Sequence, residues 1–566
     1  MPSFFLRAVA VFALWSVPAV ATAGSRDDLL RLVPDDYTFC VVVQNLREHA
    51  KSDNDSTFLK GLAESPILKA LQGSPEAKKF QLVLDTLLKD LEITPQQLRD
   101  DLLGDAIVFA YRKPATPGKP EQEDGLVLVH ARDEKLLARV VDRINALQTK
   151  AGELKAVEAV DGTDGKYFRR VKAADAGTAG FYALRGNQLL FSVQEALLKE
   201  TLAKRAATGK GEPPIAGRLK KLGVDDAPIT WLINPRAFDA DLANSARTGK
   251  GSELAFLKEF AKYWKAVDGV GVFLNFSPAL EVGVAVNVRK DDLPPAARRF
   301  YTEAGKRSPL WDRVPDNALV ALIVRTHTES MAGMLGAFLT EEDRKKVLDG
   351  LAQAARPFLD RKDLGPVARG FGPDAGFWLF PPDPKGKTWC PQALAAVRLA
   401  PGQDGRQAER AAIKGLDFLT RLASLSNREL DVFEEQYGGM VVTGLASPTL
   451  FPPGFRPCFA SKGGYIVVAG SPETIVAFDP PTGEATDAGE VPVLRISVAA
   501  WRAYLKEHRS GLTEFLAGLH KCDPATMASQ IDALLPLLEG LDRVELVQRT
   551  GPERVSLVLR FTEAKR

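Results

Sequence analysis

The stretch Leu32-Val33-Pro34-Asp35 leads into the apolar run Tyr37-Thr38-Phe39-Cys40-Val41-Val42-Val43 near the start of the chain. Far downstream, Arg313-Val314-Pro315-Asp316 leads into Ala318-Leu319-Val320-Ala321-Leu322-Ile323-Val324 in the same spacing. An apolar run that follows a Pro-Asp turn is typical of a β-strand. We therefore predict that each stretch forms the opening strand of one half of an internally duplicated protein.

Blocks that follow the opening strand also recur in the same order. Asp105–Phe109 and Asp374–Trp378 are both aromatic strands that begin with Asp-Ala, and each precedes a loop rich in Pro, Gly and Lys. Such loops break regular structure and connect the strands of a hairpin. The other paired blocks are Lys89–Pro95 with Lys362–Pro366, the loops Pro114–Pro120 and Pro381–Lys387, Leu126–Val129 with Leu394–Val397, Tyr167–Val171 with Met440–Thr443, Gly186–Phe191 with Gly463–Val468, and Pro228–Leu232 with Pro492–Ile496.

Each half contains one strongly amphipathic helix. In the first half Asp133 is the expected N-cap, and in the second half Asp404 is. Residues three and four apart share one side of a helix, and an apolar side must be covered by a sheet or another helix. The expected apolar sides are Leu136, Leu137, Val140, Val141, Ile144 and Leu147 in the first helix, and Ala408, Ala412, Leu416, Leu419 and Leu422 in the second.

Both halves end in a predicted hairpin with a period of two. In the first, the outgoing strand carries Val270, Val272, Leu274 and Phe276, and the return strand carries Leu280, Val282, Val284, Val286 and Val288. The second has Val544 and Leu546, then Val555, Leu557, Leu559 and Phe561. Such alternation predicts that the valine-rich face is packed and that the other face meets solvent.

These patterns predict an α+β protein of two similar tandem domains, each a mainly antiparallel β-sheet with helices packed on one face. The first domain is expected at residues 24–289 and the second at 308–566. Residues 290–307, which contain Pro294 and Pro295, form the expected linker, with a helical turn around Ala296–Tyr301.

The first 23 residues predict export. One basic residue, Arg7, precedes the apolar run Ala8–Trp15, and Ala21-Thr22-Ala23 ends the segment. This order is typical of a cleavable signal peptide. The alternative, a transmembrane anchor, needs roughly 20 apolar residues, and Pro18 interrupts this shorter run. We expect cleavage after Ala23, no later membrane span, and a periplasmic or extracellular protein.

Composition limits the classes of partner. The formal net charge is +2, and 26% of residues are charged. This balance gives no support to nucleic acid as a partner. The four cysteines, Cys40, Cys390, Cys458 and Cys522, lack metal-ligand spacing. Cys40 is expected in the core, and a Cys390–Cys458 disulfide is left open because spacing cannot establish it.

The search for catalytic and metal-binding motifs identifies no site residue and no cofactor. The chain lacks Gly-x-Ser-x-Gly, His-Glu-x-x-His and Cys-x-x-Cys. Gly386-Lys387-Thr388 lacks the earlier glycine of a phosphate loop, so we interpret it as a hairpin loop. The histidines are His49, His130, His327, His508 and His520, and none is paired at ligand spacing.

Acidic clusters have a structural interpretation. Asp53–Ser56 and Asp161–Gly165 lack the long ligand series of a calcium loop and are expected to be turns. Asp35 and Asp316 recur after proline, as Asp105 and Asp374 recur at strand starts. An aspartate in such a turn accepts backbone N–H groups, which explains its recurrence without a ligand.

The stretch Leu32–Leu46, together with the export signal and the tandem halves, resembles a family of exported bacterial (planctomycete-type) proteins of unknown function. The resemblance covers the opening strand of each half and the general layout, with no catalytic motif. It implies an exported α+β protein and carries no activity, cofactor or site residue.

Three functions remain open at this point, and the first is preferred. The chain is a non-enzymatic binding or scaffold protein of the cell envelope, a carrier of a lipid or other apolar ligand, or a hydrolase with an unrecognised site. A carrier predicts an apolar cavity lined by residues such as Phe109, Phe191 and Trp231. A hydrolase predicts acids that converge on a histidine, with His327 as one candidate.

Overall fold

A computed structural model describes residues 24–45, 47, 73–114, 124–174, 177–206, 211–276, 278–383 and 388–564. The predicted signal peptide, His49, the Asp53–Ser56 turn and parts of the two Pro/Gly/Lys loops lie outside the described residues. No described helix is both long and apolar enough to cross a bilayer.

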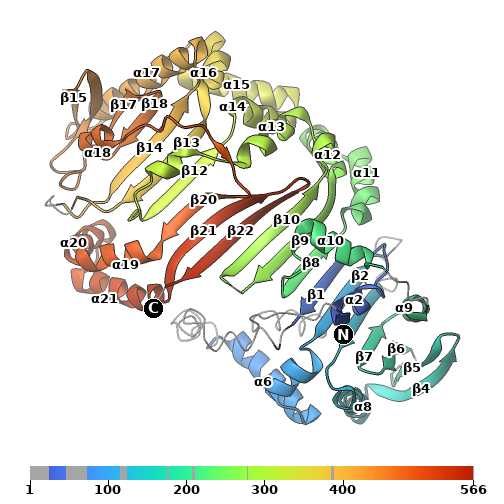
Figure 1. The fold of residues 1–566 in the computed structure, drawn as a ribbon. Coiled ribbons are helices and arrows are strands. Elements are labelled where there is room, and N and C mark those ends of the chain that lie inside the picture. Colours follow the sequence, from blue (N-terminus) through green and yellow to red (C-terminus); the bar gives the residue numbers. More distant parts are fainter. Residues whose placement is uncertain are drawn as a thin grey trace. The chain divides into compact units, whose positions relative to one another are not determined.

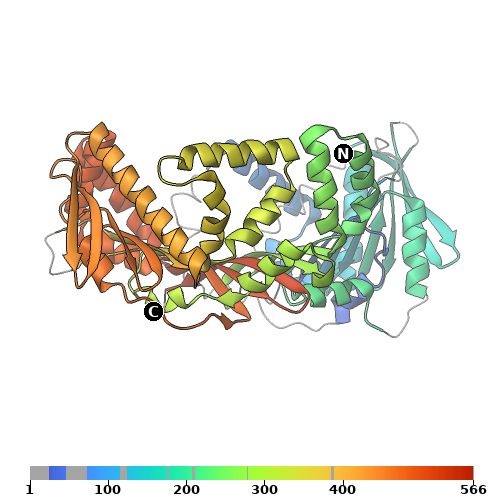
Figure 2. The same ribbon diagram turned by 90° about the horizontal axis from the view of Figure 1, so that it is seen from above.

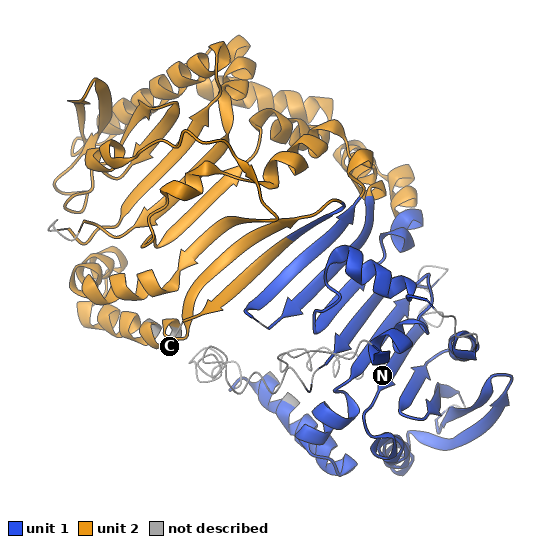
Figure 3. Ribbon diagram, in the orientation of Figure 1, with its two compact units in different colours: residues 1–241, 267–288, 553–556 blue, residues 242–266, 289–552, 557–566 orange. Residues whose placement is uncertain are grey.

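The chain divides into two compact units, which Figure 3 colours separately. Unit 1 comprises residues 1–241, 267–288 and 553–556, and unit 2 comprises 242–266, 289–552 and 557–566. Both units combine an antiparallel sheet with helices, so the predicted α+β class is confirmed (Figure 1).

The sheet of unit 1 is antiparallel throughout. Its strands pair in the spatial order β4-β5-β6-β7-β3-β2-β1-β8-β9-β10. Their bounds are β1 Phe39–Gln44, β2 Ala106–Arg112, β3 Asp124–His130, β4 Leu154–Gly162, β5 Gly165–Lys172, β6 Thr178–Arg185, β7 Gln188–Ser192, β8 Ile229–Ile233, β9 Val267–Asn275 and β10 Leu280–Val288.

The helices of unit 1 lie on both faces of this sheet. The helix α8 begins where predicted, because Asp133 accepts a hydrogen bond from the Leu136 N–H at 2.9 Å. Its Leu136, Leu137 and Val140 are buried, as the pattern predicts. The helices are α2 Gly24–Leu30, α6 Pro75–Leu91, α7 Pro95–Gln97, the short π-helix Leu98–Leu102, α8 Glu134–Lys150, α9 Glu195–Ala206 and α10 Pro214–Leu222; the 3-10 turn Pro235–Phe238 precedes α11 Asp239–Thr248.

The sheet of unit 2 repeats this strand order. Its strands pair as β15-β16-β17-β18-β14-β13-β12-β20-β21, again all antiparallel. The bounds are β12 Val320–Arg325, β13 Phe371–Phe380, β14 Gln392–Leu399, β15 Asp431–Tyr437, β16 Met440–Ala446, β17 Cys458–Lys462, β18 Tyr465–Ala469, β20 Glu490–Ser497 and β21 Leu541–Thr550, and β22 Arg554–Glu563 follows β21 along the chain; the short strands β11 Lys306–Arg307 and β19 Thr486–Asp487 pair separately.

The helices of unit 2 include the predicted linker turn, which is part of α13 Pro295–Ala304. Ser471 caps α18 by accepting a hydrogen bond from the Thr474 N–H at 3.3 Å. Figure 2 shows α14, α15 and α17 on one side of the sheet. The remaining helices are α12 Gly251–Lys265, α14 Thr328–Ala337, α15 Glu341–Ala355, α16 Leu364–Gly370, α17 Gln403–Ser426, α18 Pro472–Ala477, α19 Val498–Glu507, α20 Arg509–His520 and α21 Pro524–Leu534, with 3-10 turns at Pro309–Arg313, Arg361–Asp363 and Leu535–Leu538.

One prediction about α17 is wrong, and a second holds only in part. Its N-cap is Gly402 rather than Asp404, whose carboxylate instead accepts from the Arg369 Nε at 3.0 Å. The predicted apolar side is buried only in part, at Ala408. The helix packs through Gly405, Ala408, Ala411, Gly415 and Thr420, and leaves Leu419 and Leu422 exposed. Small residues allow close approach: a Cβ at Gly415 would lie 3.1 Å from the Phe358 ring.

The predicted polarity of the β9–β10 hairpin is also reversed. Val282 and Val284 are 44% and 43% exposed, whereas Ala285 is 0% exposed. The buried side is made of small residues because α10 packs against it. A Cβ at Gly271 would lie 3.3 Å from Leu222 of α10, and one at Gly283 would lie 2.4 Å from the Phe273 ring. The valine side is therefore the open side.

All four cysteines are free, so the Cys390–Cys458 bridge considered above is not formed. Cys40 is fully buried in β1, as predicted for a core residue. Burial raises the pKa of the Cys40 thiol to about 12.

Candidate binding surface

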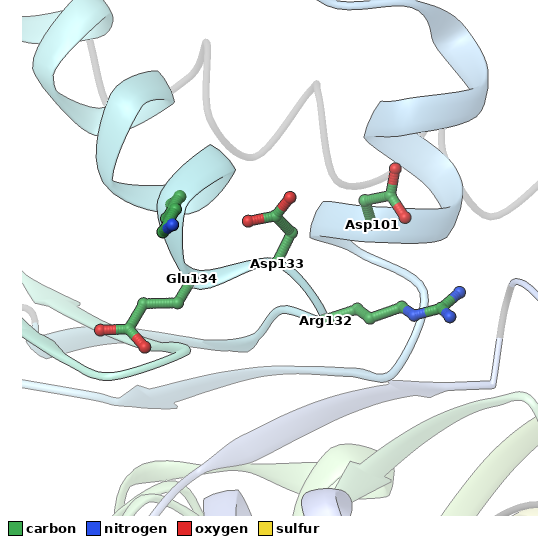
Figure 4. Close-up of a pocket in the computed structure, with 5 residues that line it drawn as sticks. Asp101, Arg132, Asp133 and Glu134 are labelled. Atoms are coloured by element: carbon green, nitrogen blue, oxygen red, sulfur yellow. The ribbon is translucent and has the colours of Figure 1, made fainter.

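A polar depression of about 400 Å³ lies at the start of α8 in unit 1, lined by Asp101, Arg132, Asp133, Glu134 and Lys135 (Figure 4). The Arg132 and Glu134 side chains point away from each other in Figure 4. Asp133 is engaged as the helix cap, and the backbone N–H of Arg132 donates to the Asp101 carbonyl at 2.8 Å. The bonds of Asp133 and of the Asp101 carbonyl show that this depression contains the start of α8.

Neither His130 nor His327 lines this depression. His130 ends β3, with its Nδ1 3.6 Å from the Asp105 carboxylate, which is too long for a hydrogen bond. His327 is the N-cap residue of α14 and is exposed. The part of the chain that the structure describes contains no group of three or more His, Cys, Asp or Glu residues arranged to hold a metal ion.

A cluster of charges closes one end of the unit 2 core. Asp374 is fully buried and accepts from Arg325 at 2.7 Å and from Arg398 at 3.2 Å. Arg325 also bonds Glu303 at 3.1 Å. Glu303 belongs to α13, so this chain of ion pairs fastens the predicted linker helix to β12, β13 and β14.

Electrostatics keeps Glu303 ionised. Burial alone raises the pKa of Glu303, but the hydrogen bond from Lys306 and the positive charge of Arg325 outweigh burial and lower the pKa below its usual value. The Lys306 Nζ donates to Glu303 at 2.8 Å. The cluster therefore consists of mutually satisfied charges, which is a structural arrangement.

Asp105 and Asp374, which the sequence placed at equivalent strand starts, do not occupy equivalent positions in the two sheets. Gln44 of β1 faces Ala106 of β2, and Arg325, at the corresponding place in β12, faces Asp374 of β13. Asp374 thus occupies the position of Ala106. Asp105 precedes β2 and therefore lies one residue before the position that corresponds to Asp374.

The unit 1 sheet has one face whose centre is apolar, which we call the open face. We define it as the sheet face that bears Val41, Phe109 and Trp231, opposite the face covered by α2, α9 and α10. Registered pairs place one row across it: Phe168, Tyr182, Phe191, Val127, Phe109, Val41, Trp231, Val272 and Val284. The helix α8 covers the β6–β7 end through Leu184 and Leu189. Trp231 is 45% exposed.

The rows that flank this one on β2, β1, β8, β9 and β10 are apolar as well. They contain Val43, Ile107, Ile229, Leu274 and Val282 on one side and Phe39, Tyr111, Ile233, Val270 and Val286 on the other. Phe39 stacks on Tyr111 at 4.7 Å between ring centroids. A sheet that faces water on one side normally alternates apolar and polar residues. These strands instead present apolar side chains on both faces.

Unit 2 has an open face of the same kind. Its central row runs through Phe459, Val468, Ala395, Phe377, Leu322, Leu494 and Leu546. The next rows add Val324, Ala375, Val397 and Ile466 on one side and Val320, Leu379 and Ala393 on the other. Leu322, Val324, Phe377 and Val468 are 38–43% exposed. The helices α16 and α17 cover the strand end near Phe371 and Leu399, and α17 continues over β15, β16 and β17.

Sequence reasoning placed Phe109, Phe191 and Trp231 around an apolar cavity. The structure brings all three into one row, but on an open face. Neither of the two depressions described is an apolar cavity: one is the polar site at α8, and the other is about 10 Å³. The signal that could have identified the open face is the unbroken apolar composition of Phe39–Val43 and Val320–Val324, which indicates strands apolar on both sides.

Comparison of the chain with protein-family models, with curated proteins and with solved structures finds no match. The argument for function therefore depends on the surface itself.

Proposed function

We propose that the chain is an exported, non-enzymatic binding protein of the cell envelope, and that the open faces of its two sheets are its binding surfaces. The observation that carries this proposal is the exposure of Trp231, Val284, Leu322 and Phe377 on faces whose central rows are apolar. Soluble monomers rarely expose large contiguous apolar patches unless the patch binds something.

Further features support this proposal. The basic residue, apolar run and Ala-x-Ala end of the first 23 residues support export. The shared strand order of the two units supports an internal duplication, which would give the protein two binding faces of the same design. Asp133 of the α8 depression and the acids of the Asp374 cluster have structural partners, and this favours binding over catalysis.

The test compares two valines of similar exposure. Val284→Gln places a polar side chain on the open face of unit 1, whereas Val193→Gln, its control, changes a residue 44% exposed just after β7. We expect Val284→Gln to weaken the binding of the apolar fluorophore bis-ANS to the full chain and Val193→Gln to leave it unchanged. Equal binding by both variants would show that the fluorophore does not bind to the open face.

A further inference from the structure

Helix α15 (Glu341–Ala355) has an apolar side that unit 2 leaves exposed. Val347, Leu348 and Leu351 are 47–55% exposed, and the only buried residue of this helix is Ala355 at its end. A helix of 15 residues is marginal when it stands alone in water, and helices in proteins are stabilised mainly by packing of an apolar side. The part of unit 2 that the structure describes supplies little of this packing to α15.

The charged side chains of α15 fall into two groups. Most of them have a partner nearby in the sequence: Glu342 pairs with Lys346, Asp343 with Thr340, Arg344 with the Gly336 carbonyl, and Asp349 with Arg361. Among the described residues, Glu341, Lys345 and the C-cap residue Arg356 have no side-chain partner. All three are exposed. The helix therefore keeps an acid near its first turn and a base at its end available for contacts outside the chain.

These unpaired charges lie in one row along the edge of the apolar side, because residues three or four apart are neighbours on a helix. The row consists of Glu341, Lys345, Leu348, Ala352 and Arg356, at spacings of four, three, four and four residues. Glu341 lies seven residues before Leu348, and Arg356 lies eight residues after it. At about 1.5 Å per residue, each charge is about 10–12 Å from Leu348 along the helix. Such a row is complementary to a copy of itself that runs in the opposite direction.

We infer that α15 binds a second copy of the chain, whose α15 lies antiparallel to it across a two-fold axis near Leu348. A two-fold interface uses the same surface on both sides, so every contact occurs twice. Glu341 lies beside the partner's Arg356 at each end of the interface, and the leucines cover one another at its centre. The apolar contact supplies affinity, and the charges at its edge set the orientation. This surface is separate from the open faces, so the inference goes beyond the proposed function.

Other occupants of this side fit the charges less well. A helix that lies on an anionic membrane is rich in Lys and Arg on its polar face, whereas Glu341 begins this row and Glu342 and Asp343 follow it. An unrelated protein could cover the leucines, but it would not require an acid and a base at matching distances on either side of Leu348. A second copy requires this arrangement, because the partner's row is the same row reversed.

The experiment is sedimentation equilibrium of the full chain at low salt over a range of protein concentrations. We expect a concentration-dependent dimer. Glu341→Arg should raise its dissociation constant at least about tenfold, because like charges then meet at both ends of the interface. Exchanging both charges, in Glu341→Arg/Arg356→Glu, should restore the dimer. The matched control, Glu342→Arg, breaks only the exposed pair with Lys346 on the opposite side of α15, and its dissociation constant should stay within about twofold of wild type.

Three results would overturn the inference. The first is a chain that stays monomeric at every concentration, and the second is a dimer that Glu341→Arg leaves unchanged. The third is a double variant that dimerises as weakly as Glu341→Arg, because the loss would then not come from the pairing of charges. Circular dichroism checks that the helix is retained, and Arg356→Glu, which lies beyond the last residue of α15, repeats the test if Glu341→Arg unfolds it. Binding of bis-ANS to the open face tests the proposed function separately.

Discussion

Replacing two adjacent residues of β10 tests which face of the unit 1 sheet is the core. Hydrophobicity alone predicts that Val284→Ala is costly and Gly283→Ala harmless. The structure predicts the reverse. Val284 is 43% exposed; losing two methyl groups at about 0.8 kcal/mol each, scaled by the buried fraction, costs about 0.9 kcal/mol. A Cβ at Gly283 would lie 2.4 Å from the ring of Phe273, itself only 4% exposed.

That overlap forces a buried ring to move, and overpacking of this kind costs about 1–3 kcal/mol. Because that Cβ would meet three atoms of the ring at 2.4, 2.5 and 3.2 Å, the cost falls at the upper end of this range. The intrinsic gain of alanine over glycine in a strand, about 0.5–1 kcal/mol, then leaves a net cost of about 2 kcal/mol. Gly125→Ala is the matched control, since the nearest atom to its Cβ is 4.0 Å away on Phe109. It should be neutral or stabilising.

The assay is urea unfolding of the full chain, combined with hydrogen exchange of peptides covering residues 267–288. The exchange measurement reports on unit 1 separately, because a two-unit protein need not unfold in a single step. We expect Gly283→Ala to lower the unfolding midpoint and accelerate exchange more than Val284→Ala. A larger loss of stability for Val284→Ala than for Gly283→Ala would show that the valine side is the core. It would contradict the assignment of that side as the open face.

Three further outcomes are expected. Asp374→Ala should cost about 3–5 kcal/mol, measured by urea unfolding, because it leaves Arg325 and Arg398 without their buried partner. Asp417→Ala, which breaks only an exposed pair with Arg421, should cost under about 1 kcal/mol. Acid should destabilise unit 2, because the pKa of Glu303 is lowered by Lys306 and Arg325 against burial, and the pKa of Glu490 is lowered by hydrogen bonds from Arg560 and Arg549. The stability that both groups supply is present above the usual glutamate pKa and is lost as pH falls below it, which a thermal-melting series in pH would measure. A thiol reagent should modify Cys522 well before the other cysteines, because burial raises the pKa of Cys40 and Cys458 to about 12 and of Cys390 to about 11. Peptide mapping reads out the order, and early modification of Cys40 would contradict it.

Local signals in the sequence were sufficient for many elements. Asp133 caps the helix that it was expected to cap, because an N-cap depends on a few neighbouring residues. The strands around Val41 in the first half and Leu322 in the second half were found from composition and the preceding Pro-Asp turn alone.

Which face packs could not be read from hydrophobicity. In β10 the contact side is the one with Gly and Ala, since the partner approaches closely there, and Val284 is left outside. A hydrophobic pattern identifies the apolar side of an element, but the packed side also depends on the distance to the partner. The Asp374 cluster was missed for a related reason: Glu303, Arg325, Asp374 and Arg398 come together only through pairings between distant strands and a helix.

The two units differ in the polarity of the side chains on the covered side of their sheets. On the covered side, one row of unit 1 consists of Gln44, Ala106 and His130, which form no ion pairs with one another. The corresponding row of unit 2 consists of Arg325, Asp374 and Arg398, which form the ion cluster. On the open side, Val41 corresponds to Leu322 and Phe109 to Phe377, and both rows remain apolar although water reaches them. If the units descend from one ancestor, as proposed, solvent alone would have allowed polar residues at these half-exposed positions. Their apolar character in both units supports the proposed role of the open faces as binding surfaces.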